Sequence, residues 1–162
     1  MFNIEYLKIN CMKIIAHRAN INGPDLKTEN SISSIRFCIN SGFDVEIDIW
    51  RIEKNLYLGH DGPMNLIREE TLFEIKEKSW IHCKNIEAMS FFQRNDRGFN
   101  YFWHEKDSYT LTSKGFIWTF PGKELYPGSI CVMPEMKNTD QIFNLKRDVI
   151  AGVCTDYPKL IN

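Results

Sequence analysis

Charged side chains that could carry out phosphate chemistry are concentrated in the first third of the sequence. They are His17, Arg18, Glu46, Asp48, His60 and Asp61. Glu46 and Asp48 flank a single residue in FDVEIDIW, a run with the composition of a strand. Side chains alternate between the faces of a strand, so both carboxylates point the same way. Two neighbouring carboxylates repel each other, and a divalent metal ion is the usual partner that relieves the repulsion.

The basic residues complete a chemical pattern around this carboxylate pair. His17 and His60 can transfer protons near neutral pH, and Arg18 can bind an anion through its guanidinium group. Together these residue types indicate metal-assisted cleavage of a phosphate ester.

The elements that must position these residues follow an alternating pattern. Helical spacing is present in four segments, which are 29–42, 68–78, 85–95 and 139–148. Eight short apolar runs are predicted strands: 12–17, 44–50, 80–84, 101–105, 109–112, 116–120, 130–135 and 151–156. A ninth, 55–60, is expected to pair with 44–50 as a hairpin.

Alternation of strands and helices favours a mainly parallel α/β sheet, and eight strands suggest a closed (β/α)8 TIM-like barrel. The usual barrel needs about 250 residues, whereas this chain has 162. We therefore predict one domain over 1–162, a reduced barrel without helices after the fourth, fifth and sixth strands. An open α/β sheet is the alternative. The segment 1–11 is expected to be a disordered or peripheral extension.

A parallel barrel collects its active site at the carboxyl ends of the strands. All four His of the chain fall at such ends: His17, His60, His82 and His104. Lys84 follows His82 on the same face of its strand, and Glu135 ends the seventh strand. This clustering predicts a single site.

Several of these motifs resemble the glycerophosphodiester phosphodiesterase family. The similar stretches are IAHRAN, TENSISSIRFCINSGFDVEIDIW and LYLGHDGP, with the closing GVCTDYPKLI. The similarity covers about residues 12–63 and the last dozen, and WIHCK resembles the family's third strand only weakly. The resemblance implies a barrel fold and hydrolysis of a phosphodiester.

The resemblance also implies a role for each matched residue. Glu46 and Asp48 would bind Ca²⁺ or Mg²⁺, and His17 and His60 would be the general acid/base pair. Arg18 and Lys84 would hold the phosphate oxygens. Glu29 would orient Arg18 or a metal-bound water.

One departure from the family pattern affects the metal. His82 stands where the family has a Glu ligand, which removes a negative charge and moves the preference toward Mn²⁺ or Zn²⁺. Alternatively His82 is not a ligand, and Glu135 or Glu29 completes the site.

Composition excludes several other classes of protein. A net charge of -1 gives no attraction toward nucleic acid, and no apolar run reaches the length of a membrane helix. The five Cys are scattered without a C-x-x-C pair, so we expect reduced thiols in a cytoplasmic protein. Aromatic residues on the bare part of the barrel wall could form a homodimer contact.

The prediction is therefore a phosphodiesterase that uses one divalent metal and acts on a glycerophosphodiester or related alkyl phosphodiester. The segment 60–80 is short and lacks the insertion that many members of the resembled family carry there, which implies an open mouth that would admit a glycan or lipid head group. One alternative is a phospholipase D-like lyase that stops at a cyclic phosphate. Another is a protein that binds phosphate ligands without turnover.

Overall fold

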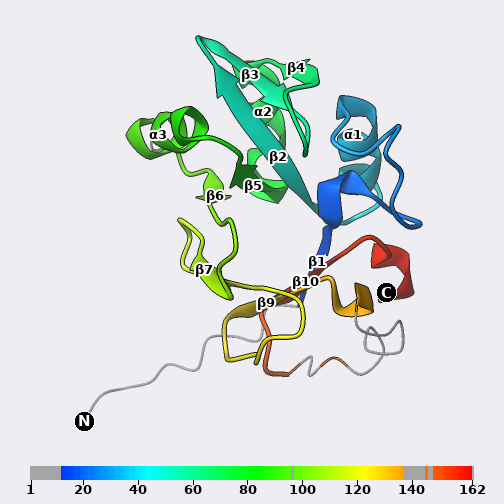
Figure 1. The fold of residues 1–162 in the computed structure, drawn as a ribbon. Coiled ribbons are helices and arrows are strands. Elements are labelled where there is room, and N and C mark those ends of the chain that lie inside the picture. The colour runs from blue at the N-terminus through cyan, green and yellow to red at the C-terminus, as the bar shows by residue number, and fades with distance from the viewer. Residues whose placement is uncertain (1–11, 96, 137–144, 146–147, 162) are drawn as a thin grey trace.

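The computed structural model describes residues 12–95, 97–136, 145 and 148–161. Over these residues the chain is a mixed α/β protein with one ten-stranded mixed sheet and three α-helices (Figure 1). The strands are β1 (Lys13–Ala16), β2 (Asp44–Ile52), β3 (Asn55–Leu58), β4 (Asn65–Ile67), β5 (Ser79–Cys83), β6 (Asn100–Phe102), β7 (Tyr109–Leu111), β8 (Ile117–Thr119), β9 (Ser129–Val132) and β10 (Gly152–Thr155). The helices are α1 (Ile32–Asn40), α2 (Glu69–Ile75) and α3 (Ile86–Arg94).

The predicted elements are largely confirmed. A strand matches each of the nine predicted runs to within one residue at its start, β2 extends two residues past the predicted end, and the helices fall inside 29–42, 68–78 and 85–95. Strand β4 was not predicted, because three residues carry too little periodicity to reveal it. The predicted helix over 139–148 and the extension over 1–11 lie outside the described residues, apart from two positions of the former.

Seven strands form a continuous parallel series in the order β6-β5-β2-β1-β10-β9-β8. Strands β3 and β4 extend β2 as an antiparallel meander, and β7 pairs antiparallel with β8. The sheet is open by hydrogen bonds, because no ladder joins β6 to β7 among the described residues. Contacts of another kind bridge this opening. Ser113 N donates to Tyr101 O at 2.8 Å, and Tyr101 N donates to Ser113 Oγ at 3.0 Å.

The first layer of core lies between the sheet and the helices. Along β2 the buried side chains of Val45, Ile47 and Ile49 alternate with polar ones and pack in the cluster that includes Leu72 of α2 and Phe92 of α3. Helices α1 and α3 begin where the sequence places side-chain caps. Ser31 Oγ accepts from Ser34 N at the start of α1, and Asn85 Oδ1 accepts from Ala88 N at the start of α3.

The second layer of core lies on the opposite face of the sheet. Six strands contribute to it. Its buried members are Ile15, Trp80, Phe102, Trp118, Ile130, Val132 and Cys154. The rings of Phe102 and Trp118 lie 4.5 Å apart between centroids, so this cluster also connects β6 to β8 across the opening. Two of its members, Trp118 and Val132, also line the cleft that contains the polar residues at the strand ends.

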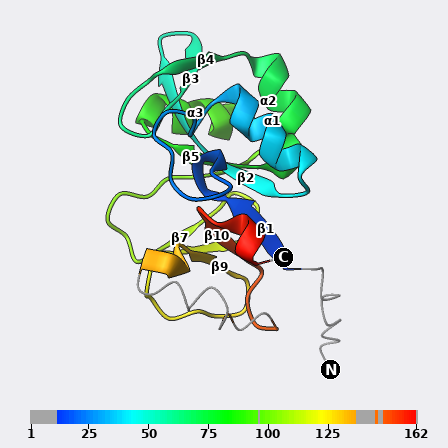
Figure 2. The ribbon, with the colours of Figure 1, turned by 90° about the vertical axis from the view of Figure 1, so that its right-hand side faces the viewer.

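The helices are unevenly distributed around the sheet. Figures 1 and 2 show α1, α2 and α3 in the half of the molecule that contains β2 to β5, whereas β7, β9 and β10 lie in the other half. No α-helix occurs after α3 within the described residues. Among those residues, no helix has both the length and the apolar character needed to cross a bilayer.

Candidate functional site: a buried carboxylate and histidine cluster

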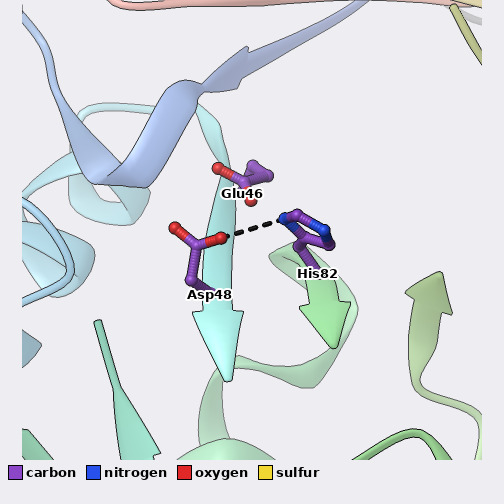
Figure 3. Close-up of side chains that lie close together, drawn as sticks. All are labelled: Glu46, Asp48 and His82. Carbon is purple, nitrogen blue, oxygen red and sulfur yellow. Dashed lines mark hydrogen bonds and ion pairs between the residues drawn. The ribbon is translucent and has the colours of Figure 1, made fainter. Parts of the chain in front are cut away.

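Three ionisable side chains meet where β2 and β5 run side by side. Glu46, Asp48 and His82 each offer a ligand atom, and these atoms lie within 4.8 Å of one another (Figure 3). The parallel register pairs Asp48 directly with His82, which brings the ring next to both carboxylates. All three are buried, at 2%, 1% and 8% exposure. Buried charges of one sign need compensation, so this cluster is the best metal candidate among the described residues.

Asp48 is held in place by neighbours on all sides. Asn30 Nδ2 donates to Asp48 Oδ2 at 2.9 Å, and Asp48 N donates to Asn30 Oδ1 at 3.0 Å. Burial alone would raise the pKa of Asp48. The hydrogen bond and charge of His82, the charge of Lys84 and the bond from Asn30 outweigh burial and hold that pKa well below its usual range. Asn30 entered the sequence analysis only within the TENSISSIRFCINSGFDVEIDIW stretch, and this role was not predicted.

Glu46 has the opposite electrostatic character. Burial, and then repulsion from Asp48, raise the pKa of Glu46 despite attraction from His17 and His82. Without an ion, one carboxyl of the pair is therefore biased toward its protonated form. A divalent cation would remove this bias, because it stabilises both carboxylates at once.

The two ring nitrogens of His82 have different partners. Nε2 lies 3.3 Å from the carbonyl oxygen of His104, and Nδ1 lies 3.0 Å from Asp48 Oδ1. Without an ion, Nδ1–H donates to Asp48. With an ion bound, Nε2 would keep the proton and donate it to the carbonyl, and the lone pair of Nδ1 would face the carboxylates and the ion. Metal-ligating His residues are usually oriented in this way, so the cluster fits a divalent ion held by two carboxylates and one imidazole.

His17 follows β1 and is oriented by the last strand. Its Nδ1 lies 2.9 Å from Oδ1 of Asp156, which also accepts from Asn20 Nδ2 at 2.8 Å. Its Nε2 lies 3.9 Å from Glu46 Oε2. Burial lowers the pKa of His17, but the bond to Asp156 and the charges of Glu46 and Asp156 outweigh burial and raise it.

Asp156 is thus a site residue, although it entered the sequence analysis only as part of the closing GVCTDYPKLI. Glu135 lies behind it rather than at the metal cluster. Glu135 Oε1 accepts from Thr155 Oγ1 at 2.8 Å and from Asp156 N at 2.9 Å. The structure therefore does not bring Glu135 into the ligand group, and Glu135 instead fixes the segment that orients His17. No sequence pattern marks this contact, because the two residues are 21 positions apart.

Arg18 occupies a constrained position next to the carboxylates. Its backbone is left-handed, with φ 49°, and its N–H donates to Glu46 Oε2 at 3.0 Å. Its Nη1 donates to Glu29 Oε1 at 3.2 Å, and its Nε lies 3.8 Å from Asp48 Oδ2. Glu29 therefore lies beside Arg18, as the family resemblance implied, and outside the ligand group. The Nε atom is buried and has no hydrogen-bond partner, so the guanidinium retains a donor.

Lys84 and His60 lie on the outer side of the cluster. Lys84 Nζ lies 3.5 Å from Asp48 Oδ1. His60 Nδ1 lies 2.6 Å from Asp61 Oδ1, and its side chain is 32% exposed. Burial, with the positive charges of Arg18 and Lys84, lowers the pKa of His60. The two predicted proton-transfer residues are therefore shifted in opposite directions, His17 upward and His60 downward.

These side chains share one cleft. It has a volume of about 310 Å³. Its charged side consists of His17, Arg18, Glu46, Asp48, His60 and His82, and its remaining lining residues are His104, Asp107, Thr110, Trp118, Phe120, Pro121, Val132, Met133 and Met136. An adjoining hollow of about 260 Å³ includes Lys84, so all the basic residues predicted for the site reach open space.

Comparisons with known proteins identify no relative. No protein-family model matches the chain, and neither a curated protein nor a solved structure matches it significantly. The functional argument therefore rests on the residues and their geometry.

Proposed function

We propose that this protein is a metal-dependent phosphodiesterase that hydrolyses a glycerophosphodiester or a related alkyl phosphodiester. The observation that carries the proposal is the cleft in which a buried carboxylate–imidazole cluster lies beside Arg18 and two His with opposite pKa shifts. A metal site alone would not require the proton-transfer pair, and a phosphate-binding site alone would not require the buried carboxylates.

Glu46, Asp48 and His82 would hold the ion. Their buried donor set suits Mg²⁺ or Ca²⁺ through its oxygens and Mn²⁺ or Zn²⁺ through its imidazole. When bound, a divalent ion supplies positive charge that polarises the phosphoryl group. Arg18 and Lys84 would add charge against the non-bridging oxygens, where negative charge develops in the transition state.

The two His residues would divide the proton transfers. His60, with its lowered pKa, is mainly neutral near pH 7 and would accept a proton from the attacking water. His17, with its raised pKa, would donate a proton to the alkoxide as the bond between phosphorus and the ester oxygen breaks. The products are a phosphomonoester and an alcohol. Asp156 would keep His17 in the tautomer and orientation for this step.

The open sheet is also compatible with the predicted barrel, which we propose as a (β/α)8 arrangement with one unpaired seam. The barrel would consist of eight strands in the order β1, β2, β5, β6, β7, β8, β9 and β10. Of these, β7 runs antiparallel to its neighbour β8. The bonds of Ser113 to Tyr101 and the contact of Phe102 with Trp118 support closure at the seam. Short connections leave no room for the missing helices.

The test is hydrolysis of bis(p-nitrophenyl) phosphate and glycerophosphocholine after chelation, with Mg²⁺, Ca²⁺, Mn²⁺ or Zn²⁺ restored singly. We expect metal-restored turnover that falls by about 10²- to 10⁴-fold in His17→Gln, while Arg36→Gln, an exposed change on α1, has no effect. Phosphorus NMR separates hydrolysis from a lyase, because a lyase accumulates a cyclic phosphate. Absence of turnover with every metal, together with retained phosphate binding, would favour a protein that only binds.

A further inference from the structure

The cleft has a second side whose chemistry differs from that of the metal cluster. Six lining residues from β8, β9 and the segments that follow them are apolar: Trp118, Phe120, Pro121, Val132, Met133 and Met136. We call these six the apolar wall. No Lys or Arg lies among the described residues of the cleft on this side.

Three polar side chains, His104, Asp107 and Thr110, line the same cleft and could serve a hydroxyl that reached them, but none of them belongs to the wall. Thr110 Oγ1 already donates to Trp103 O at 2.9 Å, and Asp107 Oδ2 lies 3.4 Å from Glu105 N. A glycerol or sugar hydroxyl pressed against the wall would lose its hydrogen bonds to water without replacement, which is costly. An alkyl chain has no such bonds to lose and gains from leaving water.

Two members of the wall remain open to solvent. Phe120 is 43% exposed and Met136 is 66% exposed. Their neighbour Met133 has a left-handed backbone with φ 46°, an unfavourable conformation that is anchored by its N–H donating to Cys154 O at 2.7 Å. Strained residues are concentrated at ligand sites, and Met side chains adapt to apolar ligands of varied shape.

We propose that the apolar wall binds a hydrophobic ester group of the substrate, so that the preferred phosphodiester carries an alkyl chain on one side of phosphorus. This inference rests on the proposed function for the placement of the phosphate beside Arg18 and the metal cluster. Phe120 and Met136 are then specificity-determining residues. Glycerophosphocholine, which is polar on both sides of phosphorus, would be hydrolysed more slowly than a phosphodiester that carries an alkyl chain.

The experiment measures binding of methyl, butyl, hexyl and octyl phosphate to the Mn²⁺-loaded protein by titration calorimetry. These monoesters place one phosphate and one chain in the cleft and require no turnover. We expect affinity to rise about fourfold for each methylene that the wall buries. A rise that stops at hexyl identifies a short alkyl group, and a rise that continues to octyl identifies a lipid-like chain.

Variants locate the effect on the wall. Phe120→Asn should weaken hexyl phosphate about tenfold and Met136→Gln about threefold, with methyl phosphate unchanged. Phe37→Asn, an equivalent change at an exposed Phe on α1, should leave the whole series unchanged. Equal affinity for methyl and hexyl phosphate, or a chain-length gain that survives both wall variants, would overturn the proposal.

The result is separable from that of the hydrolysis test. A chain-length gain in a protein that turns over no diester would retain the wall and reject the phosphodiesterase. Metal-dependent turnover with no chain-length gain would retain the enzyme and reject the wall.

Discussion

The two halves of the molecule differ in how they build one cleft. Strands β1, β2, β5 and β6 adjoin α1, α2 and α3, and the buried cluster between them is the larger of the two main cores. Strands β7 to β10 have no α-helix against them within the described residues. The helix-covered half supplies the carboxylates, the imidazoles and the basic groups, whereas the other half supplies mainly apolar surface.

This difference follows from what each half must hold. Buried like charges such as Glu46 and Asp48 repel each other and stay together only on a backbone that other contacts fix firmly. A wall that contacts an alkyl chain needs no such precision, because apolar contacts are not directional. The half formed by β7 to β10, which has no α-helix against it among the described residues, therefore provides the contacts that need the least precise geometry.

The largest expected effect comes from making the same substitution in each half. Asp48→Asn removes a ligand and a charge from the metal cluster, whereas Asp107→Asn changes a carboxylate that lines the same cleft just before β7 and lies outside the ligand group. We expect the first to lower kcat/KM roughly 10³-fold and the second to change it only a few-fold. Steady-state kinetics with metal restored after chelation measures both. Similar losses in the two variants would show that the halves do not differ in function.

A second pair compares the stability of the halves. Leu72 of α2 is 1% exposed in the larger core, and Leu111 of β7 is 66% exposed. Leu72→Ala should lower the free energy of unfolding by about 2–5 kcal/mol, and Leu111→Ala by no more than about 0.5 kcal/mol. Urea denaturation followed by circular dichroism provides the comparison. A large loss at Leu111 would indicate that a partner or a contact covers β7 in solution.

The smallest effect concerns the contact that joins the halves, between His17 after β1 and Asp156 after β10. In the metal-free protein the pKa of His17 lies above 6.5. Asp156→Asn should lower it, because burial is then opposed mainly by Glu46. NMR titration of the His ring protons measures the change. His104, whose pKa is lowered to about 4 by burial, His82 and Lys84, is the internal control and should not move.

The same contact predicts a pH window for stability. A raised pKa of His17 stabilises the fold fully below 6.5 and ceases to do so as pH rises through the folded value. A lowered pKa of Asp156 stabilises the fold above 3.8 and ceases to do so as pH falls through its folded value. The difference in stability between wild type and Asp156→Asn should therefore be largest between pH 3.8 and 6.5. A difference independent of pH would mean that the pair is not ionic.

Local spacing in the sequence predicted some elements of the fold and not others. The i, i+2 spacing in β2 predicted that Glu46 and Asp48 share a face, because alternation is a local property of the strand. The helical spacing of apolar residues over 29–42 likewise predicted α1. Strand β4, with three residues, left no periodic signal. Only six residues separate β6 from β7 in the sequence, yet no ladder joins them among the described residues, and no local pattern encodes this choice of partners.

For the candidate site, the sequence by itself determined which side chains were available and which strand faces they share. It gave the carboxylate pair and placed all four His at strand ends, because these are consequences of residue type and short spacing. Only the tertiary structure decided that Asp48 pairs with His82 across two strands, that Asp156 rather than Glu135 orients His17, and that an apolar wall faces the charges. These outcomes depend on strand register and long-range packing, which are set by the whole core at once.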